Sequence, residues 1–161
     1  MTEKPNLFPK FTTTTSAPPE TIGLGERLGK RLLPGSVLML SGDLGTGKTT
    51  FIKGLARGLG FEADLSEVLS PSYVLVREVP CSVILYHVDL YRLNRVAGED
   101  AAGIMDCMQS GGVTAVEWGE KAREIFPKAF LSVKISYNGE LGRDICFEGV
   151  GGFQWLGSKK L

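Results

Sequence analysis

Short apolar runs alternate along the chain with segments in which apolar side chains recur at helical spacing. Runs at 36–41, 83–89 and 113–118 predict strands, and the nearly unbroken second run predicts a strand buried on both faces. Segments 22–32 and 51–59 predict helices, because their apolar residues recur every three or four positions. Such alternation predicts an α/β fold, with helices packed on a sheet.

The remaining elements are shorter. Residues 11–15 are β-prone and predict an edge strand, and 73–76 predict a strand that ends before Pro80. Two segments around a glycine-containing loop, 130–137 and 144–147, predict a closing β-hairpin. Weaker helical patterns are present in two more segments: 97–109 and 119–125.

Length and composition fit one domain with a sizeable core, since the chain has 161 residues of which 43% are apolar. We place this domain at residues 11–150, between a flexible N-terminal tail at 1–10 and a C-terminal tail at 151–161. Gly54 and Gly58 lower the intrinsic propensity of their helix, and we expect them to permit close packing of that helix on the sheet.

Charge and cysteine content disfavour several classes of protein. Eighteen basic and eighteen acidic residues cancel, whereas a chain that grips nucleic acid by itself usually carries a basic excess. We therefore disfavour tight, direct binding of nucleic acid, and this charge balance leaves contact through a partner open. Three cysteines without a C-x-x-C pair disfavour disulfide scaffolds and zinc sites. No apolar run reaches membrane-spanning length and no signal-peptide core is present, so we predict a cytoplasmic protein without membrane contact.

The most informative segment reads Gly-Asp-Leu-Gly-Thr-Gly-Lys-Thr at 42–49, a complete phosphate-binding loop, or Walker A motif. It lies between a predicted strand and a predicted helix, where backbone N–H groups and the helix dipole favour an anion. Lys48 would reach the β- and γ-phosphates, and the Thr49 hydroxyl would bind Mg²⁺. In this context the fold prediction becomes a P-loop NTPase-like three-layer sandwich, with a central, mostly parallel sheet and antiparallel edge strands.

Two acids end predicted strands, Asp89 after 83–89 and Glu117 near the end of 113–118. Ligands in open α/β sheets lie beyond the carboxyl ends of the strands, so both acids are expected near the phosphate loop. Asp89 would hold Mg²⁺ directly or through water, opposite Thr49, and Glu117 would orient or deprotonate the attacking water or complete the metal shell. The alternatives are a turn cap at Asp89 and a solvated acid at Glu117.

Other polar residues near these positions allow two interpretations each. The hydroxyls of Ser70 and Ser72 would form a switch that senses the γ-phosphate, or belong to an ordinary Ser-Pro turn. His87 is the single histidine, and a satisfied core residue is favoured over a partner of the site or a proton carrier. Arg92 fits a phosphate or protein contact as well as a surface salt bridge.

Four separated segments together resemble the TsaE (YjeE) family of bacterial ATPases, over roughly residues 11–149. The phosphate loop is similar to the family's loop, and Ser70-Pro71-Ser72-Tyr73 to its switch segment. His87-Val88-Asp89-Leu90-Tyr91-Arg92 and Val116-Glu117-Trp118 resemble two further family elements in the same order. Thr46, Ser72 and Gly119 stand where alanine, threonine and proline are common, and none of these departures removes a group that the mechanism needs.

The resemblance implies roles for individual residues. Phosphate contacts are implied for Lys48 and for the backbone amides of the loop: Gly45, Thr46, Gly47, Lys48, Thr49 and Thr50. Metal binding is implied for Thr49, Asp89 and Glu117, and catalysis for both acids together with Lys48. Trp118 would lie near the nucleotide, Arg143 would reach the site, and the segment at 18–21 would border the adenine.

The function implied by the resemblance is Mg²⁺-dependent ATP hydrolysis in support of the threonylcarbamoyl modification of adenosine 37 in tRNA, through the partner proteins TsaD and TsaB. The resemblance implies that tRNA is contacted only indirectly, through these partners. We expect the isolated chain to hydrolyse ATP slowly or only with a partner. Two alternatives stay open. A small-molecule kinase would need an acceptor pocket and a basic lid, and a nucleotide-controlled binding module would need no hydrolysis.

Overall fold

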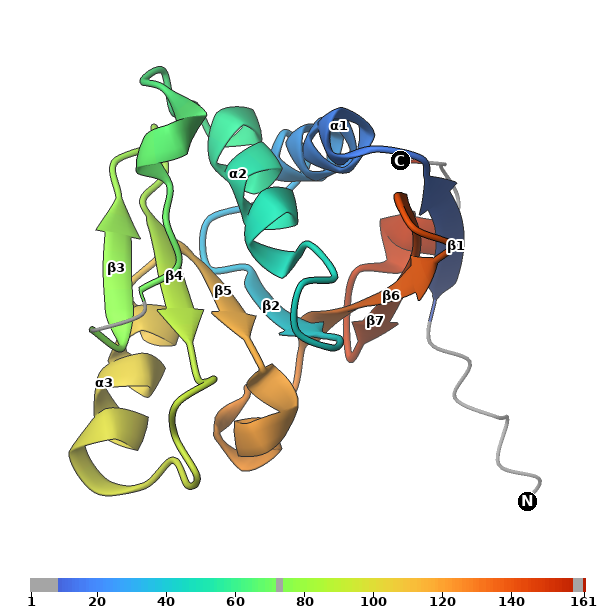
Figure 1. Ribbon diagram of the computed structural model, residues 1–161. Coiled ribbons are helices and arrows are strands. Elements are labelled where there is room, and N and C mark those ends of the chain that lie inside the picture. The colour runs from blue at the N-terminus through green and yellow to red at the C-terminus, as the bar shows by residue number, and fades with distance from the viewer. Residues whose placement is uncertain (1–8, 72–73, 158–160) are drawn as a thin grey trace.

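The computed structural model describes residues 9–71, 74–157 and 161, and strands and helices alternate through most of them. Chain order is shown in Figure 1. The strands are β1 (Lys10–Thr15), β2 (Val37–Ser41), β3 (Val76–Val79), β4 (Leu85–Asp89), β5 (Val113–Glu117), β6 (Phe130–Asn138) and β7 (Gly142–Val150). The α-helices are α1 (Pro18–Gly29), α2 (Lys48–Gly58) and α3 (Gly98–Gln109), and the 3₁₀ segments are η1 (Leu65–Glu67), η2 (Gly119–Ile125) and η3 (Gln154–Gly157).

One seven-stranded sheet runs in the order β1-β7-β6-β2-β5-β4-β3. The central strands β6, β2, β5 and β4 are parallel to their neighbours in that group. Both edges are antiparallel, with β3 on β4 at one edge and the β6–β7 hairpin followed by β1 at the other. This arrangement confirms the predicted mixed α/β sheet with a parallel centre and antiparallel edges.

Helical segments cover both faces of the sheet and give three layers (Figure 1). On one face, α1 and α2 enclose the larger core, which includes Leu28, Phe51 and Leu131. On the other face, α3 and η2 cover a smaller core that includes Ile104 and Val116. The parallel strands therefore end between helical layers, and the loop from β2 to α2 lies at that end of the sheet.

Helices α1 and α2 approach each other closely at glycine positions. A Cβ built on Gly54 would lie 2.1 Å from the carbonyl oxygen of Ile22, and one on Gly58 would lie 2.3 Å from that of Glu26. The glycines thus permit close packing of one helix on the other. Our expectation that they serve contact with the sheet is wrong, because the partner backbone belongs to α1.

One strand has different bounds from those that the sequence predicts. The strand predicted at 73–76 begins at Val76 instead and continues to Val79, pairing with β4 through the exposed residues Arg77 and Glu78. A strand at the edge of a sheet can expose polar side chains to solvent, so a search for apolar residues does not identify it. In the predicted C-terminal tail, η3 places Leu156 in the core at 2% exposure.

The N-terminal tail predicted at 1–10 lies mostly outside the described residues, and β1 begins at Lys10. Within the described residues, no helix has the length and hydropathy needed to cross a membrane.

Candidate nucleotide-binding site

The segment 42–49 forms the loop after β2 and the first two residues of α2, as its motif predicts. Gly47 precedes α2 with φ 101° and ψ 26°, a left-handed conformation that glycine adopts without steric cost. This geometry leaves the first N–H groups of α2 without helical partners and directs them toward the end of the loop. Such an arrangement favours an anion at the helix N-terminus.

Lys48 lies folded over this loop and is 4% exposed. Its Nζ donates hydrogen bonds to the carbonyl oxygens of Gly42 at 2.7 Å and Asp43 at 2.9 Å. Burial lowers the pKa of the Lys48 ammonium, and nearby carboxylates, Glu117 first, oppose that shift. A phosphate at this position would therefore stabilise the charged form that burial disfavours.

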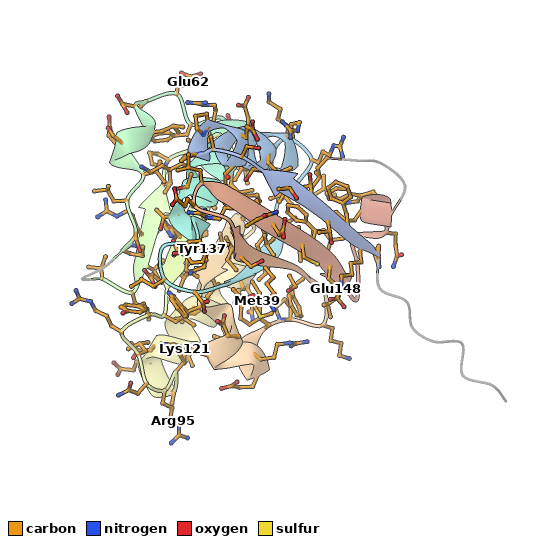
Figure 2. The ribbon with its side chains drawn as sticks, turned by 45° about the vertical axis from the view of Figure 1, so that its right-hand side comes forward. Met39, Glu62, Arg95, Lys121, Tyr137 and Glu148 are labelled. Atoms are coloured by element: carbon orange, nitrogen blue, oxygen red, sulfur yellow. The ribbon has the colours of Figure 1, made fainter. Side chains whose placement is uncertain are left out.

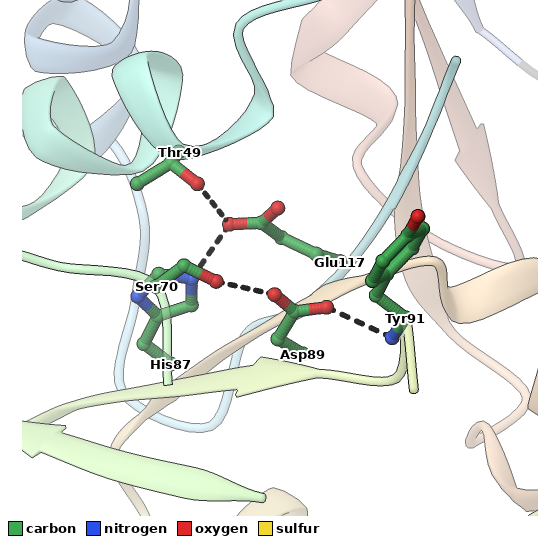
Figure 3. A network of polar contacts seen from close by, with 6 residues as sticks. All are labelled: Thr49, Ser70, His87, Asp89, Tyr91 and Glu117. Carbon is green, nitrogen blue, oxygen red and sulfur yellow. Dashed lines mark hydrogen bonds and ion pairs between the residues drawn. The ribbon is translucent and has the colours of Figure 1, made fainter. Parts of the chain in front are cut away.

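Thr49, Glu117 and His87 form a chain of hydrogen bonds from α2 across the ends of β5 and β4 (Figure 3). The Thr49 hydroxyl donates to Oε1 of Glu117 at 2.7 Å, and Nε2 of His87 lies 2.8 Å from the same oxygen. Glu117 is 4% exposed and His87 is fully buried. The single histidine is thus a core residue, as favoured from the sequence, and it is also a partner of a predicted site residue.

Asp89 lies opposite Glu117 in the register of β4 and β5, but its contacts are different. Its carboxylate accepts hydrogen bonds from the Ser70 hydroxyl and from the backbone N–H of Tyr91 (Figure 3). The sequence placed both acids near Thr49, and the structure gives the direct contact to Glu117. Asp89 instead holds the predicted switch segment through Ser70, while Ser72 lies outside the described residues.

A cavity of about 560 Å³ opens above these residues. The phosphate loop contributes Gly45, Gly47, Lys48, Thr49 and Thr50, and the strand ends contribute Asp89, Glu117 and Trp118. Further lining comes from Leu44, Ser70, Pro71, Val74, Leu75, Tyr91, Arg92 and Leu93. The structure therefore brings most of the predicted site residues together around one space.

The donor set around Thr49 suits Mg²⁺ better than a softer metal. A hydroxyl and two carboxylates are hard oxygen ligands, and Mg²⁺ usually binds one or two carboxylates together with substrate phosphates and water. In the part of the chain that the structure describes, no cluster of three or more His, Cys, Asp or Glu side chains is arranged to hold an ion. The residues fit a metal that arrives with a nucleotide rather than a cage made by the protein alone.

Two predicted nucleotide contacts are not among the cavity lining. Thr46 is fully buried, and its hydroxyl donates to the Asp43 carbonyl at 2.9 Å. Arg143 donates from Nε to the Thr46 carbonyl at 2.8 Å, so it supports the loop from the side of β7. Direct contact of either residue with a nucleotide stays a prediction.

Sequence reasoning missed two residues that fix the borders of the cavity, and Figure 2 labels both. The Tyr137 hydroxyl on β6 donates to the Leu44 carbonyl in the phosphate loop at 2.7 Å. Lys121 on η2 donates to the carbonyl oxygens of Leu90, Tyr91 and Leu93, at 3.3, 2.7 and 3.3 Å. Neither belongs to a motif, so no local signal in the sequence identified them.

The segment expected to border the adenine lines a different cavity. Pro19 and Glu20 lie with Thr13, Gly23 and Arg27 around a space of about 430 Å³ between β1 and α1. None of these residues is part of the lining of the larger cavity. The adenine contact of this segment stays a prediction.

Comparison with known proteins gives one consistent relationship. A family model described as "Threonylcarbamoyl adenosine biosynthesis protein TsaE" matches residues 15–145. The chain is 38% identical over 138 residues to the "tRNA threonylcarbamoyladenosine biosynthesis protein TsaE" of Bacillus subtilis, covering 85% of this chain and 84% of that protein. It is 34% identical over 126 residues to the protein of the same name from Treponema pallidum, covering 78% and 91%.

A solved structure agrees with the sequence matches. The crystal structure of Bacillus subtilis YdiB superposes with a TM-score of 0.77 at 30% identity, covering 94% of this chain and 93% of that one. The family match spans the phosphate loop, both strand-end acids and most of the β6–β7 hairpin. This chain therefore belongs to the TsaE family, whose proteins take part in the biosynthesis of threonylcarbamoyladenosine in tRNA.

Proposed function

We propose that this protein is a Mg²⁺-dependent P-loop ATPase that supports the threonylcarbamoyl modification of adenosine 37 in tRNA by acting on a TsaD–TsaB complex. One observation carries the proposal: Lys48, Thr49, Asp89 and Glu117 converge on one cavity at the N-terminus of α2. A buried cation, a hydroxyl and two carboxylates at this position are the groups that bind and activate a magnesium–triphosphate in P-loop proteins.

Each residue has a defined task in the hydrolysis. Lys48 exchanges its two carbonyl partners for phosphate oxygens, and the N–H groups at the start of α2 bind the same anion. Thr49 keeps its hydrogen bond to Glu117 and presents its oxygen lone pairs to the metal site. Thr49 with Glu117 or Asp89 would hold Mg²⁺ there, and the metal would supply positive charge to the transferred phosphoryl group. Glu117 or Asp89 orients the water that attacks the γ-phosphate in line.

Two features support dependence on a protein partner. Apolar side chains at the edge of the cavity are exposed, with Leu44 at 64%, Val74 at 55% and Tyr91 at 48%. A partner that covers them would also exclude water from the site. The zero net charge fits a chain that contacts protein rather than tRNA. ATP turnover would then reset the TsaD–TsaB complex between modification cycles.

The decisive experiment compares Lys48→Ala with Lys53→Ala, a matched change five residues further along α2 and outside the cavity. Calorimetry should show nucleotide binding for the wild type and Lys53→Ala and a loss of at least 100-fold in affinity for Lys48→Ala, with unchanged circular dichroism. Undiminished affinity of Lys48→Ala would refute the assignment.

Phosphate release measured with and without TsaD and TsaB tests the catalytic part of the proposal. Phosphate should appear slowly without any acceptor and faster with the partners. Transfer only to an added small molecule would favour a kinase. In Glu117→Gln, hydrolysis should collapse, and docking to the partners in ATP should persist. Partner docking with ATP but without hydrolysis in the wild type would favour a binding module.

A further inference from the structure

His87 is a buried polar residue that the proposed mechanism does not use. It lies on β4 opposite Ala115 of β5, two residues before Asp89, and it is fully buried. Within the described residues its Nδ1 is buried without a hydrogen-bond partner. A buried imidazole with one unsatisfied nitrogen is less favourable than an apolar side chain of similar volume. A role in packing alone therefore does not account for a histidine here.

The other ring nitrogen has a specific partner. Nε2 lies 2.8 Å from Oε1 of Glu117, and a carboxylate oxygen is an acceptor. The tautomer with its proton on Nε2 donates to Glu117 and leaves only a lone pair on Nδ1, whereas the other tautomer would place two acceptors face to face. The contacts of the ring thus define it as a donor to Glu117.

The same oxygen of Glu117 also accepts the proton of Thr49. Because the threonine hydroxyl has a single proton, donating it to Glu117 points the oxygen lone pairs away from the carboxylate, toward the cavity. Thr49 lines that cavity together with Glu117, and Figure 3 shows the hydrogen bond between their side chains. The orientation of Glu117, fixed by His87, therefore determines how the Thr49 oxygen is presented to a metal.

We propose that His87 is a positioning residue for the Mg²⁺ site, which acts by holding Glu117 in the orientation that Thr49 and the metal require. This inference rests on the proposed ATP and Mg²⁺ binding. Hydrogen-bond partners behind metal-binding side chains typically change metal affinity by 10- to 100-fold when they are removed. We expect a change in metal affinity and not in nucleotide affinity, because His87 does not line the cavity and Lys48 would bind the phosphates through other contacts.

The test compares His87→Leu and His87→Asn with His87→Gln. The amide nitrogen of glutamine reaches the position of Nε2, whereas that of asparagine is too short and leucine has no donor. Thr114→Val serves as a control for disturbance of the core, since Thr114 is a buried β5 residue whose hydroxyl has no partner among the described residues. Each variant is titrated with ADP in EDTA and with Mn²⁺ in the presence of ADP, followed by electron paramagnetic resonance.

We expect His87→Leu and His87→Asn to weaken Mn²⁺ binding at least tenfold while ADP affinity in EDTA stays within twofold of the wild type. His87→Gln should restore Mn²⁺ affinity to within threefold, and Thr114→Val should leave both affinities unchanged. Should His87→Leu fail to fold, His87→Asn and His87→Gln still make the comparison.

Unchanged Mn²⁺ affinity in His87→Asn would overturn the inference, as would an equal loss in both titrations or no recovery with glutamine. A wild-type chain that binds no ADP in EDTA would overturn the proposed function as well. Normal ADP binding with unaltered metal binding in the variants would overturn only the role of His87.

Discussion

The ammonium nitrogen of Lys48 lies 4.2 Å from the centroid of the Trp118 ring. Lys121 approaches the same ring, with Nζ 5.5 Å from its centroid. Trp118 itself has φ 58° and ψ 31°, a left-handed conformation that is unfavourable for a bulky side chain. The ring face and two loop carbonyls thus stabilise the Lys48 charge where a phosphate would bind.

We predict that nucleotide binding changes the emission of Trp118, because Lys48 must leave its present contacts to reach the phosphates. Trp155, the second tryptophan, lies next to Phe153 in the C-terminal segment and serves as the internal reference. Fluorescence titration with ATP should give a saturable change in Trp155→Phe and none in Trp118→Phe. A response that persists in Trp118→Phe would contradict the predicted movement of Lys48.

Tyr137 connects the β6–β7 hairpin to the phosphate loop, and the Arg143 guanidinium lies 4.6 Å from its ring centroid. Tyr137→Phe removes one hydrogen bond to the Leu44 carbonyl, worth about 1 kcal/mol, so we expect nucleotide affinity to fall roughly fivefold. Stability should change little, since Tyr137 is 50% exposed. Calorimetry compares the nucleotide affinity of Tyr137→Phe with that of Tyr86→Phe, a control outside the cavity. Equal nucleotide affinities of the two variants would show that the loop holds its shape without this contact.

Much of the site follows from the sequence, because its parts are local. The motif at 42–49 fixes a loop before a helix, and parallel strands deliver Asp89 and Glu117 to the same end of the sheet. Which of the two acids contacts Thr49 does not follow from the sequence. Thr49 contacts Glu117 rather than Asp89 because of strand positions and side-chain directions that no single segment encodes.

Long-range contacts account for the other differences. Lys121 and Tyr137 each reach backbone carbonyls distant in sequence, and both look like ordinary polar positions when read alone. Gly54 and Gly58 indicate a close approach, but the sequence does not show which element approaches. The sequence prediction placed strand β3 too early in the chain. Arg77 and Glu78 are polar and exposed, so a pattern of apolar residues does not include them.

Cys81 should be an unreactive thiol despite its partial exposure. Burial raises its pKa from an ordinary value of 9.0 to about 11, so little thiolate is present near pH 8. Its alkylation by iodoacetamide, followed by mass spectrometry, should rise with pH to a midpoint near pH 11 in the folded chain and near pH 9 in urea. Identical profiles in both states would refute this.

The same shift in Cys81 makes stability depend on pH. The folded state favours the protonated thiol. The stabilisation that this thiol contributes is fully present below pH 9.0 and is lost as the pH rises through the folded-state pKa of about 11. Urea denaturation across this range should show a smaller decline in unfolding free energy for Cys81→Ala than for the wild type. A parallel decline in both proteins would show that other groups dominate.

Two glycine-to-alanine substitutions should change the free energy of unfolding in opposite directions, because only one of these glycines lies in the contact between α1 and α2. In Gly54→Ala the new methyl would lie 2.1 Å from the Ile22 carbonyl oxygen, so the helices must separate and unfolding free energy should fall by about 1–3 kcal/mol or more. Gly103 lies on an exposed face of α3 with nothing within 4 Å, and Gly103→Ala should stabilise by about 0.5–1 kcal/mol through reduced freedom of the unfolded chain. Urea denaturation of both variants separates helix propensity from packing, because propensity alone would stabilise both. A stabilised Gly54→Ala would mean that α1 and α2 do not need this close approach.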